Sequence, residues 1–575
     1  MQFRNKLHLA VFFFVFFIIS LIEGTRVILD IRILYYILIL TPFLLFLLDT
    51  KQKYTLPRIY VILISIYLLF STISLATSKQ IGASIELYLR DLSLILVSLY
   101  SYTYAEKIKQ MLPRSLVLLS LIFIGASLVL LFTPYGREFI RGVRLNLLFN
   151  PVYPHKAIGD YLTFAIVICS YGILIAKDKN WLVPLLFLLP FFVLSFSRTA
   201  YIAGGVTVLY ILFTFRHSLP HIPKGYYFSI VLNVLFGIVF FVLLATRINH
   251  TLFTSVQTNL ESTLSMFARP FGYSRFPFWQ MGISAFYDSP FTGFGQGSFP
   301  FISYRYMIEL FLPTLTSFNL FIDTLAEQGI GAVITLIILC VYVLLKARKQ
   351  SLFYFLFIAL LISFMGFSSF TYTQIWMIFF ITIGVLLPRD KGLLVPVSKQ
   401  LVLICAGIGI AFIQVVIVHT LLIHADNRVI AQKIYPYNPD NVKALIATSR
   451  LYEQNNPQTD ALLTEYKKLV AMDAFALEYV GDVYSSMGEV YTHKAIHAYK
   501  ESFTWGTYAY GNDLYERMQK LYILIEKSEG RESADAYVYT FLSDYKKILK
   551  KDYKPIQLET YNRIESLINH SEDIE

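Results

Sequence analysis

Long apolar segments fill most of the first 424 residues. Because a helix rises about 1.5 Å per residue, about 20 apolar residues span the hydrocarbon core of a membrane. The apolar runs therefore predict an all-α, polytopic membrane bundle of about 12–13 spans. We place the spans at 9–22, 31–48, 59–76, 86–104, 115–133, 158–176, 181–196, 199–215, 228–245, 318–345, 351–369, 373–388 and 400–423.

Alternate connections between these segments carry most of the lysine and arginine residues. Basic connections stay on the cytoplasmic side of a membrane, so the pattern predicts a cytoplasmic N-terminus and an extracytoplasmic region after residue 424. On the outer side, only the two longest connections, 134–156 and 247–317, are rich in basic residues, and we expect functional residues there. The predicted cytoplasmic connections contain residues 4–6, 51–58, 107–114, 177–179, 216–224, 346–349 and 389–399.

The composition changes after the membrane domain, 1–424. Residues 426–575 hold 18 basic and 23 acidic side chains, whereas the whole chain has a formal net charge of +11. Apolar residues recur there at helical spacing, which predicts a separate, soluble helical-repeat domain at 425–575. The pattern resembles tetratricopeptide repeats, and a generic helical bundle is the alternative. The clearest repeat contains Val480, Gly481, Tyr484, Ala495, Tyr499 and Phe503.

The composition excludes several other classes of protein. Of the 575 residues, 56% are hydrophobic and 15% are charged, whereas a soluble globular domain carries about 25% charged residues. Cys169, Cys340 and Cys405 each lie in an apolar run, so we expect neither a disulfide framework nor a cysteine metal site. The basic residues are scattered rather than gathered in a stripe, so no nucleic-acid binding is predicted.

Two arginines are candidates for binding an anionic substrate. Arg198 lies between two apolar segments, and an arginine at membrane depth is costly unless it is paired or faces a wet cavity. Arg275 and Trp279 are four residues apart in the 247–317 outer loop and would share one face of a helix. A guanidinium group suits a diphosphate because it stays charged and offers a fork of donors. An interfacial anchor is the alternative role for each arginine.

The segment after Trp279 contains a glycine-rich run and two carboxylates. The Gly-x-Gly-x-Gly run at 293–297 predicts a tight turn with close backbone approach. It is not a dinucleotide site, because no strand and βαβ unit frame it. Asp323 and Glu327 lie one helical turn apart near the start of span 318–345, where carboxylates complement the helix dipole. A catalytic role for them is the alternative.

Four motifs occur in a fixed order along this part of the chain. They are Ser-Arg-Thr-Ala at 197–200, Arg-x-x-x-Trp at 275–279, Pro-x-x-Gly-x-Gly-x-Gly-x-Phe at 290–299, and Asn319 followed by Leu-Ala-Glu-x-Gly at 325–329. Together they resemble the O-antigen ligase and polymerase family over about residues 145–390. The resemblance implies a cell-envelope glycosyltransferase of lipopolysaccharide or other polysaccharide biosynthesis in the cytoplasmic (inner) membrane. Such an enzyme moves a glycan from an undecaprenyl-diphosphate carrier to a glycan, lipid or protein acceptor on the outer face.

The resemblance also implies roles for individual residues. Arg198 and Arg275 match positions where the family uses arginines to hold the diphosphate, and we add Trp279 and Arg305 as substrate-binding candidates. Fixed arginines stabilise the charge that develops on a leaving diphosphate without a metal ion. The outer loops contain no Asp-x-Asp element in a divalent-metal setting, so we expect no metal and no cofactor.

One position departs from the family pattern. Ligases of this family commonly have histidine immediately before the asparagine of the fourth motif, and this chain has Phe318 there. The usual candidate for activating the acceptor hydroxyl is therefore missing. The catalytic base is unassigned, and the candidates are Glu309, Asp323 and His155.

Several functions remain open at this point. The leading hypothesis is an O-antigen ligase type of transfer, and polymerisation of polysaccharide is the alternative within the family. A transporter or flippase of lipid-linked sugar explains many spans and basic residues as well, although transporters often show internal repeats of hydropathy. A non-catalytic scaffold is a further alternative. The C-terminal repeats are predicted to bind acceptor, glycan or a protein partner.

Overall fold

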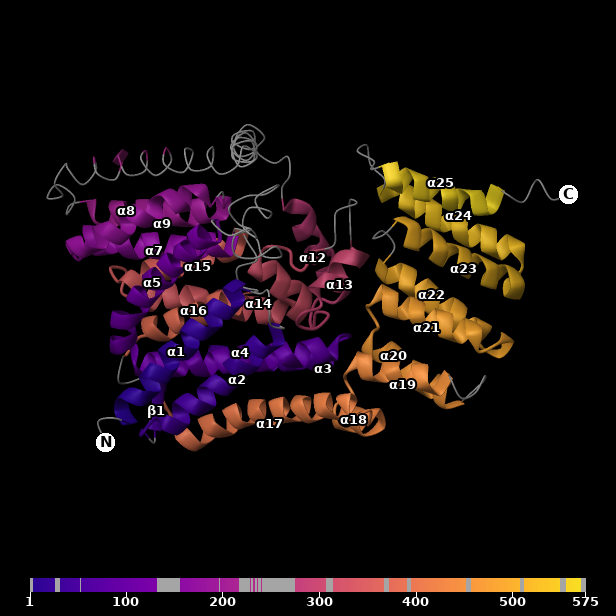
Figure 1. Ribbon diagram of the computed structural model, residues 1–575, viewed down its shortest axis with the longest axis horizontal. Coiled ribbons are helices and arrows are strands. Elements are labelled where there is room, and N and C mark those ends of the chain that lie inside the picture. The colour runs from indigo at the N-terminus through magenta and orange to yellow at the C-terminus, as the bar shows by residue number, and fades with distance from the viewer. Residues whose placement is uncertain are drawn as a thin grey trace.

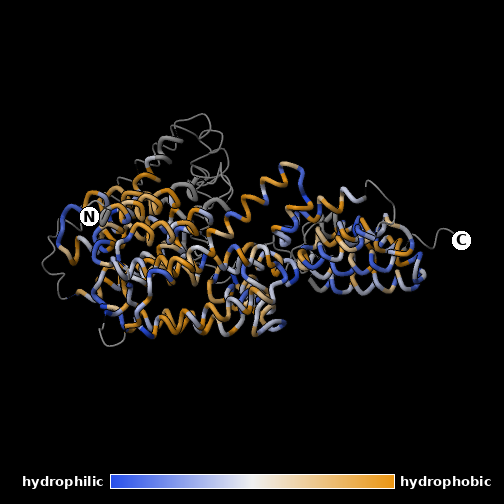
Figure 2. The backbone as a smooth tube through the Cα atoms, turned by 90° about the horizontal axis from the view of Figure 1, so that it is seen from below, coloured by the Kyte–Doolittle hydropathy of each residue, from blue (hydrophilic) through white to orange (hydrophobic). Residues whose placement is uncertain are grey.

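The computed structural model describes residues 4–25, 31–51, 53–131, 156–195, 197–216, 275–306, 314–366, 372–389, 394–450, 457–506, 511–548 and 555–569, with isolated positions between 228 and 239. A bundle of apolar helices lies beside a second group of helices formed after residue 424 (Figure 1). Hydrophobic residues dominate the bundle, whereas the second group mixes hydrophilic and hydrophobic residues (Figure 2).

Twelve of the thirteen predicted spans coincide with helices in the described residues, which confirms the helical membrane fold. The remaining segment, 228–245, lies outside the described residues apart from isolated positions. The bundle helices are α1 (Arg4–Thr25), α2 (Ile31–Leu48), α3 (Arg58–Ala76), α4 (Ile81–Thr103), α5 (Ala105–Leu131), α7 (Lys156–Leu174), α8 (Leu182–Leu194), α9 (Arg198–Thr214), α14 (Leu320–Lys346), α15 (Leu352–Gly366), α16 (Thr373–Leu386) and α17 (Lys399–His424).

Four helices of the described residues, namely α3, most of α5, α14 and α17, are long and apolar enough to cross a membrane. Shorter apolar helices pack among them. The helix α16 lies at the centre, and all of its residues are buried. Its Gly384 allows close packing on α4, because a Cβ at this position would lie 2.3 Å from the Ser98 carbonyl oxygen.

The fold contains one small antiparallel ribbon that the sequence did not predict. The strand β1 (Lys53–Pro57) pairs with β2 (Leu394–Ser398), with Lys53 opposite Ser398 and Pro57 opposite Leu394. The two strands precede α3 and α17 and are far apart in the sequence. No hairpin turn connects them, so their pairing could not be predicted from a local turn motif. The ribbon joins two connections that were both predicted to be cytoplasmic.

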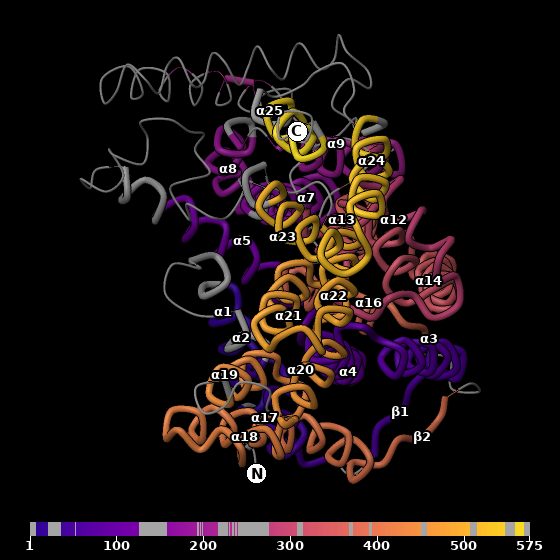
Figure 3. The backbone as a smooth tube through the Cα atoms, turned by 90° about the vertical axis from the view of Figure 1, so that its right-hand side faces the viewer, coloured from indigo at the N-terminus to yellow at the C-terminus, as the bar shows by residue number. Residues whose placement is uncertain are grey.

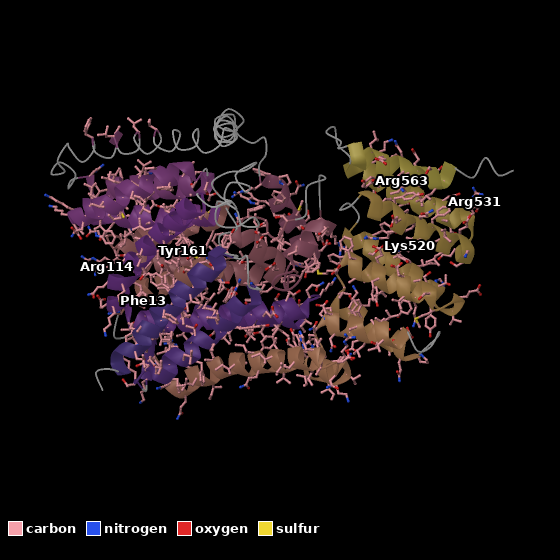
Figure 4. The ribbon with its side chains drawn as sticks, in the orientation of Figure 1. Phe13, Arg114, Tyr161, Lys520, Arg531 and Arg563 are labelled. Carbon is pink, nitrogen blue, oxygen red and sulfur yellow. The ribbon has the colours of Figure 1, made fainter. Side chains whose placement is uncertain are left out.

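The described parts of the basic connections 51–58, 107–114, 346–349 and 389–399 lie together at one end of the bundle, which we call the basic end. Residues from the starts or ends of α5, α7, α9, α14, α15 and α16 surround one cavity there. Arg114 lies at this end, whereas Lys520, Arg531 and Arg563 lie in the C-terminal helices beside the opposite end (Figure 4). The short helices α12 (Phe276–Asp288) and α13 (Phe299–Arg305) lie at that opposite end, next to the start of α14 (Figure 1).

The C-terminal helices follow one another across this opposite end, from α18 beside α17 to α25 (Figure 3). Neighbouring helices pack in pairs, α19 with α20, α21 with α22, and α23 with α24. The Val480-Gly481 signal lies at such a contact, since a Cβ on Gly481 would lie 3.0 Å from the Tyr499 ring. The assignment of these pairs to tetratricopeptide repeats stays a prediction. The helices are α18 (Arg428–Ile434), α19 (Pro439–Arg450), α20 (Pro457–Leu469), α21 (Ala474–Ser486), α22 (Thr492–Gly506), α23 (Gly511–Glu529), α24 (Arg531–Ile548) and α25 (Pro555–Asn569).

Candidate functional site

The glycine-rich run and the start of α14 form one substructure. We call residues 290–298 the glycine loop. Gly293, Gly295 and Gly297 all have positive φ, a conformation that glycine adopts without strain. A Cβ on Gly293 would lie 2.2 Å from the carbonyl carbon of Glu327, so only glycine fits against α14. The third and fourth motifs of the sequence therefore pack directly on each other.

Gly329 explains how a loop can pair with the interior of a helix. Its φ of +80° and ψ of −179° interrupt the helical geometry of α14. The amide of Ile330 then donates to the Pro290 carbonyl at 2.9 Å instead of to a carbonyl of its own helix. The carbonyl of Ala326 accepts from the Phe294 amide at 3.1 Å. The break thus releases backbone groups of α14, and the glycine loop satisfies them.

The side chain of Glu327 adds a further connection. Its Oε1 atom accepts a hydrogen bond from the amide of Phe299 at 3.0 Å, at the first residue of α13. Asp323 accepts from the Ser317 amide at 2.7 Å and is buried. Both carboxylates therefore bind backbone amides of neighbouring segments, which supports a structural role for each.

A buried ion pair in α4 supports the glycine loop from the other side. Arg90 Nη2 lies 2.9 Å from Asp91 Oδ1, and the two side chains are 11% and 4% exposed. Asp91 also accepts hydrogen bonds from Gln296 Nε2 at 3.0 Å and Trp376 Nε1 at 3.1 Å. A third neutral donor is the Tyr67 hydroxyl at 3.2 Å. The carboxylate thereby ties α3, α4 and α16 to the glycine loop.

Arg275 lies beside the turn that begins α14. It is the residue preceding α12, and its guanidinium carbon lies 5.2 Å from the centre of the Phe318 ring. Phe318 has φ of +64°, which is unusual for an aromatic residue and marks a constrained turn. Asn319 fixes this turn, because its Oδ1 accepts from the Phe321 amide at 3.0 Å while its Nδ2 donates to the Met365 carbonyl at 3.1 Å.

The start of α9 also lies near Arg275. The hydroxyl of Thr199 lies 3.4 Å from the Gly366 carbonyl oxygen. A Cβ on Gly366 would lie 3.3 Å from Thr199 Cγ2 and 3.6 Å from Arg275 Nη1. The backbone of Arg198 therefore begins α9 next to the Arg275 guanidinium, although the Arg198 side chain lies outside the described residues.

The structure describes some of the other predicted site residues and not others. Trp279 lies one turn after Arg275, its ring packs on Phe276 at 5.6 Å, and its indole nitrogen is buried with no acceptor among the described residues. Arg275 stacks on the ring of Phe318. His155 and Glu309 lie outside the described residues.

Arg305 lies at the contact with the C-terminal helices. Its guanidinium carbon is 4.5 Å from the centre of the Trp505 ring, and its Nη2 is 3.4 Å from Asp288 Oδ2. Lys79 approaches the same indole at 5.5 Å. Partial burial and the nearby Arg305 charge lower the pKa of Lys79 below its ordinary value. Trp505 and Phe294 also meet edge to face at 6.0 Å, so the C-terminal helices contact the glycine loop directly.

A comparison with known protein families found a match for this region. A family model for O-antigen ligases matches residues 183–337. The chain carries an O-antigen ligase domain. No curated protein and no solved structure matches the chain.

The O-antigen ligase match contains all four motifs and the candidates Arg198, Arg275, Trp279, Arg305 and Asp323. Members of this family use lipid-linked glycans as substrates, and with its apolar helices the chain is a multi-pass membrane protein. Among the described residues, no three His, Cys, Asp or Glu side chains gather closely enough to hold a metal ion. Metal independence stays a prediction.

Some residues that support the O-antigen ligase motifs lie outside the match and were not predicted from the sequence. Arg90 and Asp91 are two charged residues inside the apolar segment 86–104. Charged residues are costly within a membrane helix and mark functional or supporting positions, so this pattern is the feature of the sequence that identifies them. Gln328, within the fourth motif, accepts a hydrogen bond from the Ser71 hydroxyl at 2.8 Å. The contact of Ser71 in α3 with Gln328 in α14 cannot be predicted from sequence spacing alone.

Proposed function

We propose that this protein transfers a glycan from an undecaprenyl-diphosphate carrier to an acceptor, at the end of the bundle where α12, α13 and the start of α14 meet. The observation that carries the proposal is that Arg275 and the start of α9, both within the O-antigen ligase match, converge beside Gly366. In the proposed orientation, this end faces outward and the basic end faces the cytoplasm.

The chemistry follows from the residues at this centre. A guanidinium group held by the constrained turn at 318–319 is placed to bind a diphosphate and to stabilise the charge that it gains as the glycosidic bond breaks. Arg198 begins the adjacent helix and supplies the second guanidinium in this proposal. Arg275 is partly buried on the Phe318 ring, and reduced exposure to water strengthens its electrostatic contacts.

The acceptor hydroxyl receives little help from this centre. The ring of Phe318 fills the position next to Arg275 where family ligases commonly have histidine. General-base catalysis is typically worth about 10²- to 10⁴-fold in rate, so transfer proceeds without it at a lower rate or with a base from another residue. Because Asp323 binds the Ser317 amide, a base from elsewhere in the outer loop or from the acceptor is favoured.

An Arg275→Ala variant tests the proposal. In cells that depend on this protein, carrier-linked glycan should accumulate and product should fall by about 10²- to 10³-fold, the effect of removing one charge-stabilising donor. Arg275→Lys keeps the charge without the fork and should retain part of the activity. Arg114→Ala, an exposed residue at the basic end, is the matched control and should behave as wild type (Figure 4). Unchanged product in a normally inserted Arg275→Ala protein would remove Arg275 from the site.

A polymerase is the second candidate, and Phe318 is the observation that favours it, since the histidine common in family ligases is absent. Purified protein, lipid-linked donor and defined acceptors separate the alternatives. Lengthened carrier-linked glycan indicates polymerisation, whereas glycan on a different acceptor indicates ligation. A transporter would form neither product in detergent.

A further inference from the structure

The basic end contains a cavity that the proposed transfer reaction does not use. It has a volume of about 680 Å³ and lies among the ends of α5, α7, α9, α14, α15 and α16. Its lining has two parts. The apolar part includes Phe215, Phe353 and Leu386, and the basic part consists of Lys109, Lys346, Arg348 and Arg389.

The basic residues outnumber the carboxylates around the cavity. Among the described residues of the lining, Glu106 is the one acidic residue, and it lies 2.9 Å from Lys109 Nζ and 3.5 Å from Arg389 Nη1. Lys346 and Arg348 have no carboxylate oxygen within 4.0 Å among the described residues. In the described part of the chain, four cations from three separate connections thus line one cavity together with one carboxylate.

Topology alone does not explain this arrangement. Positive charges that only fix membrane orientation need to be on the cytoplasmic side, but they need not face one another. Lys53 and Arg58, for example, belong to another basic connection, are exposed and do not line the cavity. Cations that repel one another are held together here by the fold, which favours a bound anion that relieves the repulsion.

We propose that this cavity binds the phosphate headgroup of an anionic glycerophospholipid. The mixed lining favours a lipid over a soluble anion, because Phe215, Phe353 and Leu386 offer an apolar surface to the first part of the acyl chains. Basic pockets between membrane helices on the cytoplasmic side are known to suit acidic lipid headgroups. The site is distinct from the O-antigen ligase motifs, which lie at the opposite end.

The test uses full-length protein in nanodiscs of phosphatidylcholine, into which phosphatidylglycerol is titrated. Native mass spectrometry counts bound lipid, and thermal unfolding reports stabilisation. We expect saturable binding of phosphatidylglycerol, and binding about tenfold weaker in the double variant Lys346→Gln, Arg348→Gln. The matched control is Lys53→Gln with Arg58→Gln, which removes two exposed charges at the same end and should bind as wild type. Equal thermal unfolding of all proteins in pure phosphatidylcholine shows that they are folded.

Three results would overturn the proposal. If the control pair weakens binding as much as the cavity pair, the attraction is a diffuse property of the basic end. If inorganic phosphate binds as tightly as phosphatidylglycerol and displaces it, the cavity is a site for a soluble anion. A second variant, Arg389→Gln, should weaken lipid binding as well, and unchanged binding in both cavity variants would also reject the site.

Discussion

The guanidinium carbon of Arg305 lies 4.5 Å from the centre of the Trp505 indole, so a residue of α13 stacks on a residue of α22. Trp505 is only 5% exposed, and it packs with Phe294 of the glycine loop, Met281 and Leu477 in one hydrophobic cluster. The contact joins the C-terminal helices to the segment that carries the family motifs. Movement of these helices is therefore expected to be transmitted to the glycine loop.

Trp505→Ala should release this contact. Truncation of a buried tryptophan costs about 3 to 5 kcal/mol, and the stacking on Arg305 is lost as well. We expect faster amide hydrogen exchange in α13 and α22, with the bundle core unchanged. Tyr539→Ala, at a ring that is 59% exposed on α24, serves as the control. Equal exchange in Trp505→Ala and wild type would show that the two parts are held together by other contacts.

Gly293→Ala and Gly329→Ala should each disrupt the pairing of the glycine loop with α14. Both positions have positive φ, and the added Cβ would lie 2.2 Å and 2.3 Å, respectively, from backbone atoms of the opposing segment. We expect a loss of several kcal/mol in stability or a failure to accumulate in the membrane. Gly205→Ala, in α9, introduces a Cβ with no neighbour within 4 Å in the described structure and should be neutral or slightly stabilising. The yield of folded protein in detergent measures the difference.

Asp91→Ala should be strongly destabilising. The substitution leaves the buried charge of Arg90 without its partner, and it removes the acceptor of Gln296 and Trp376. Loss of one member of a buried ion pair costs about 3 to 5 kcal/mol. Trp376→Phe removes a single hydrogen bond and should cost about 1 kcal/mol. Thermal unfolding in detergent compares the two variants, and similar midpoints would contradict the central role of the carboxylate.

Gly366→Leu tests the position of the proposed diphosphate site. A side chain here would enter the space between Thr199 and the Arg275 guanidinium, where even a Cβ would have neighbours at 3.3 and 3.6 Å. We expect product to fall as far as in Arg275→Ala while the protein still inserts into the membrane. Gly407→Leu, in an open position on α17, is the control. Full activity of Gly366→Leu would place the reaction elsewhere in the molecule.

Much of the architecture was predictable because membrane insertion is decided locally. A long apolar run must become a helix in lipid, where every backbone group needs a partner within its own segment. Twelve spans followed from this rule, whereas the later helical region followed from apolar residues at helical spacing. The glycine loop was predicted as a tight turn for the same kind of reason, since glycine's conformational freedom is a property of the residue itself.

The sequence alone determined the helical membrane fold, the separate composition of residues 426–575 and the motifs of an O-antigen ligase domain, because these depend on residue type and local spacing. Only the tertiary structure decided which distant segments meet. It placed Asp91 of α4 on Gln296 of the glycine loop, Arg275 beside the start of α9, and Trp505 on Arg305. These contacts depend on the helices packing in one particular order, and hydrophobic burial specifies a face of each helix without naming its partner.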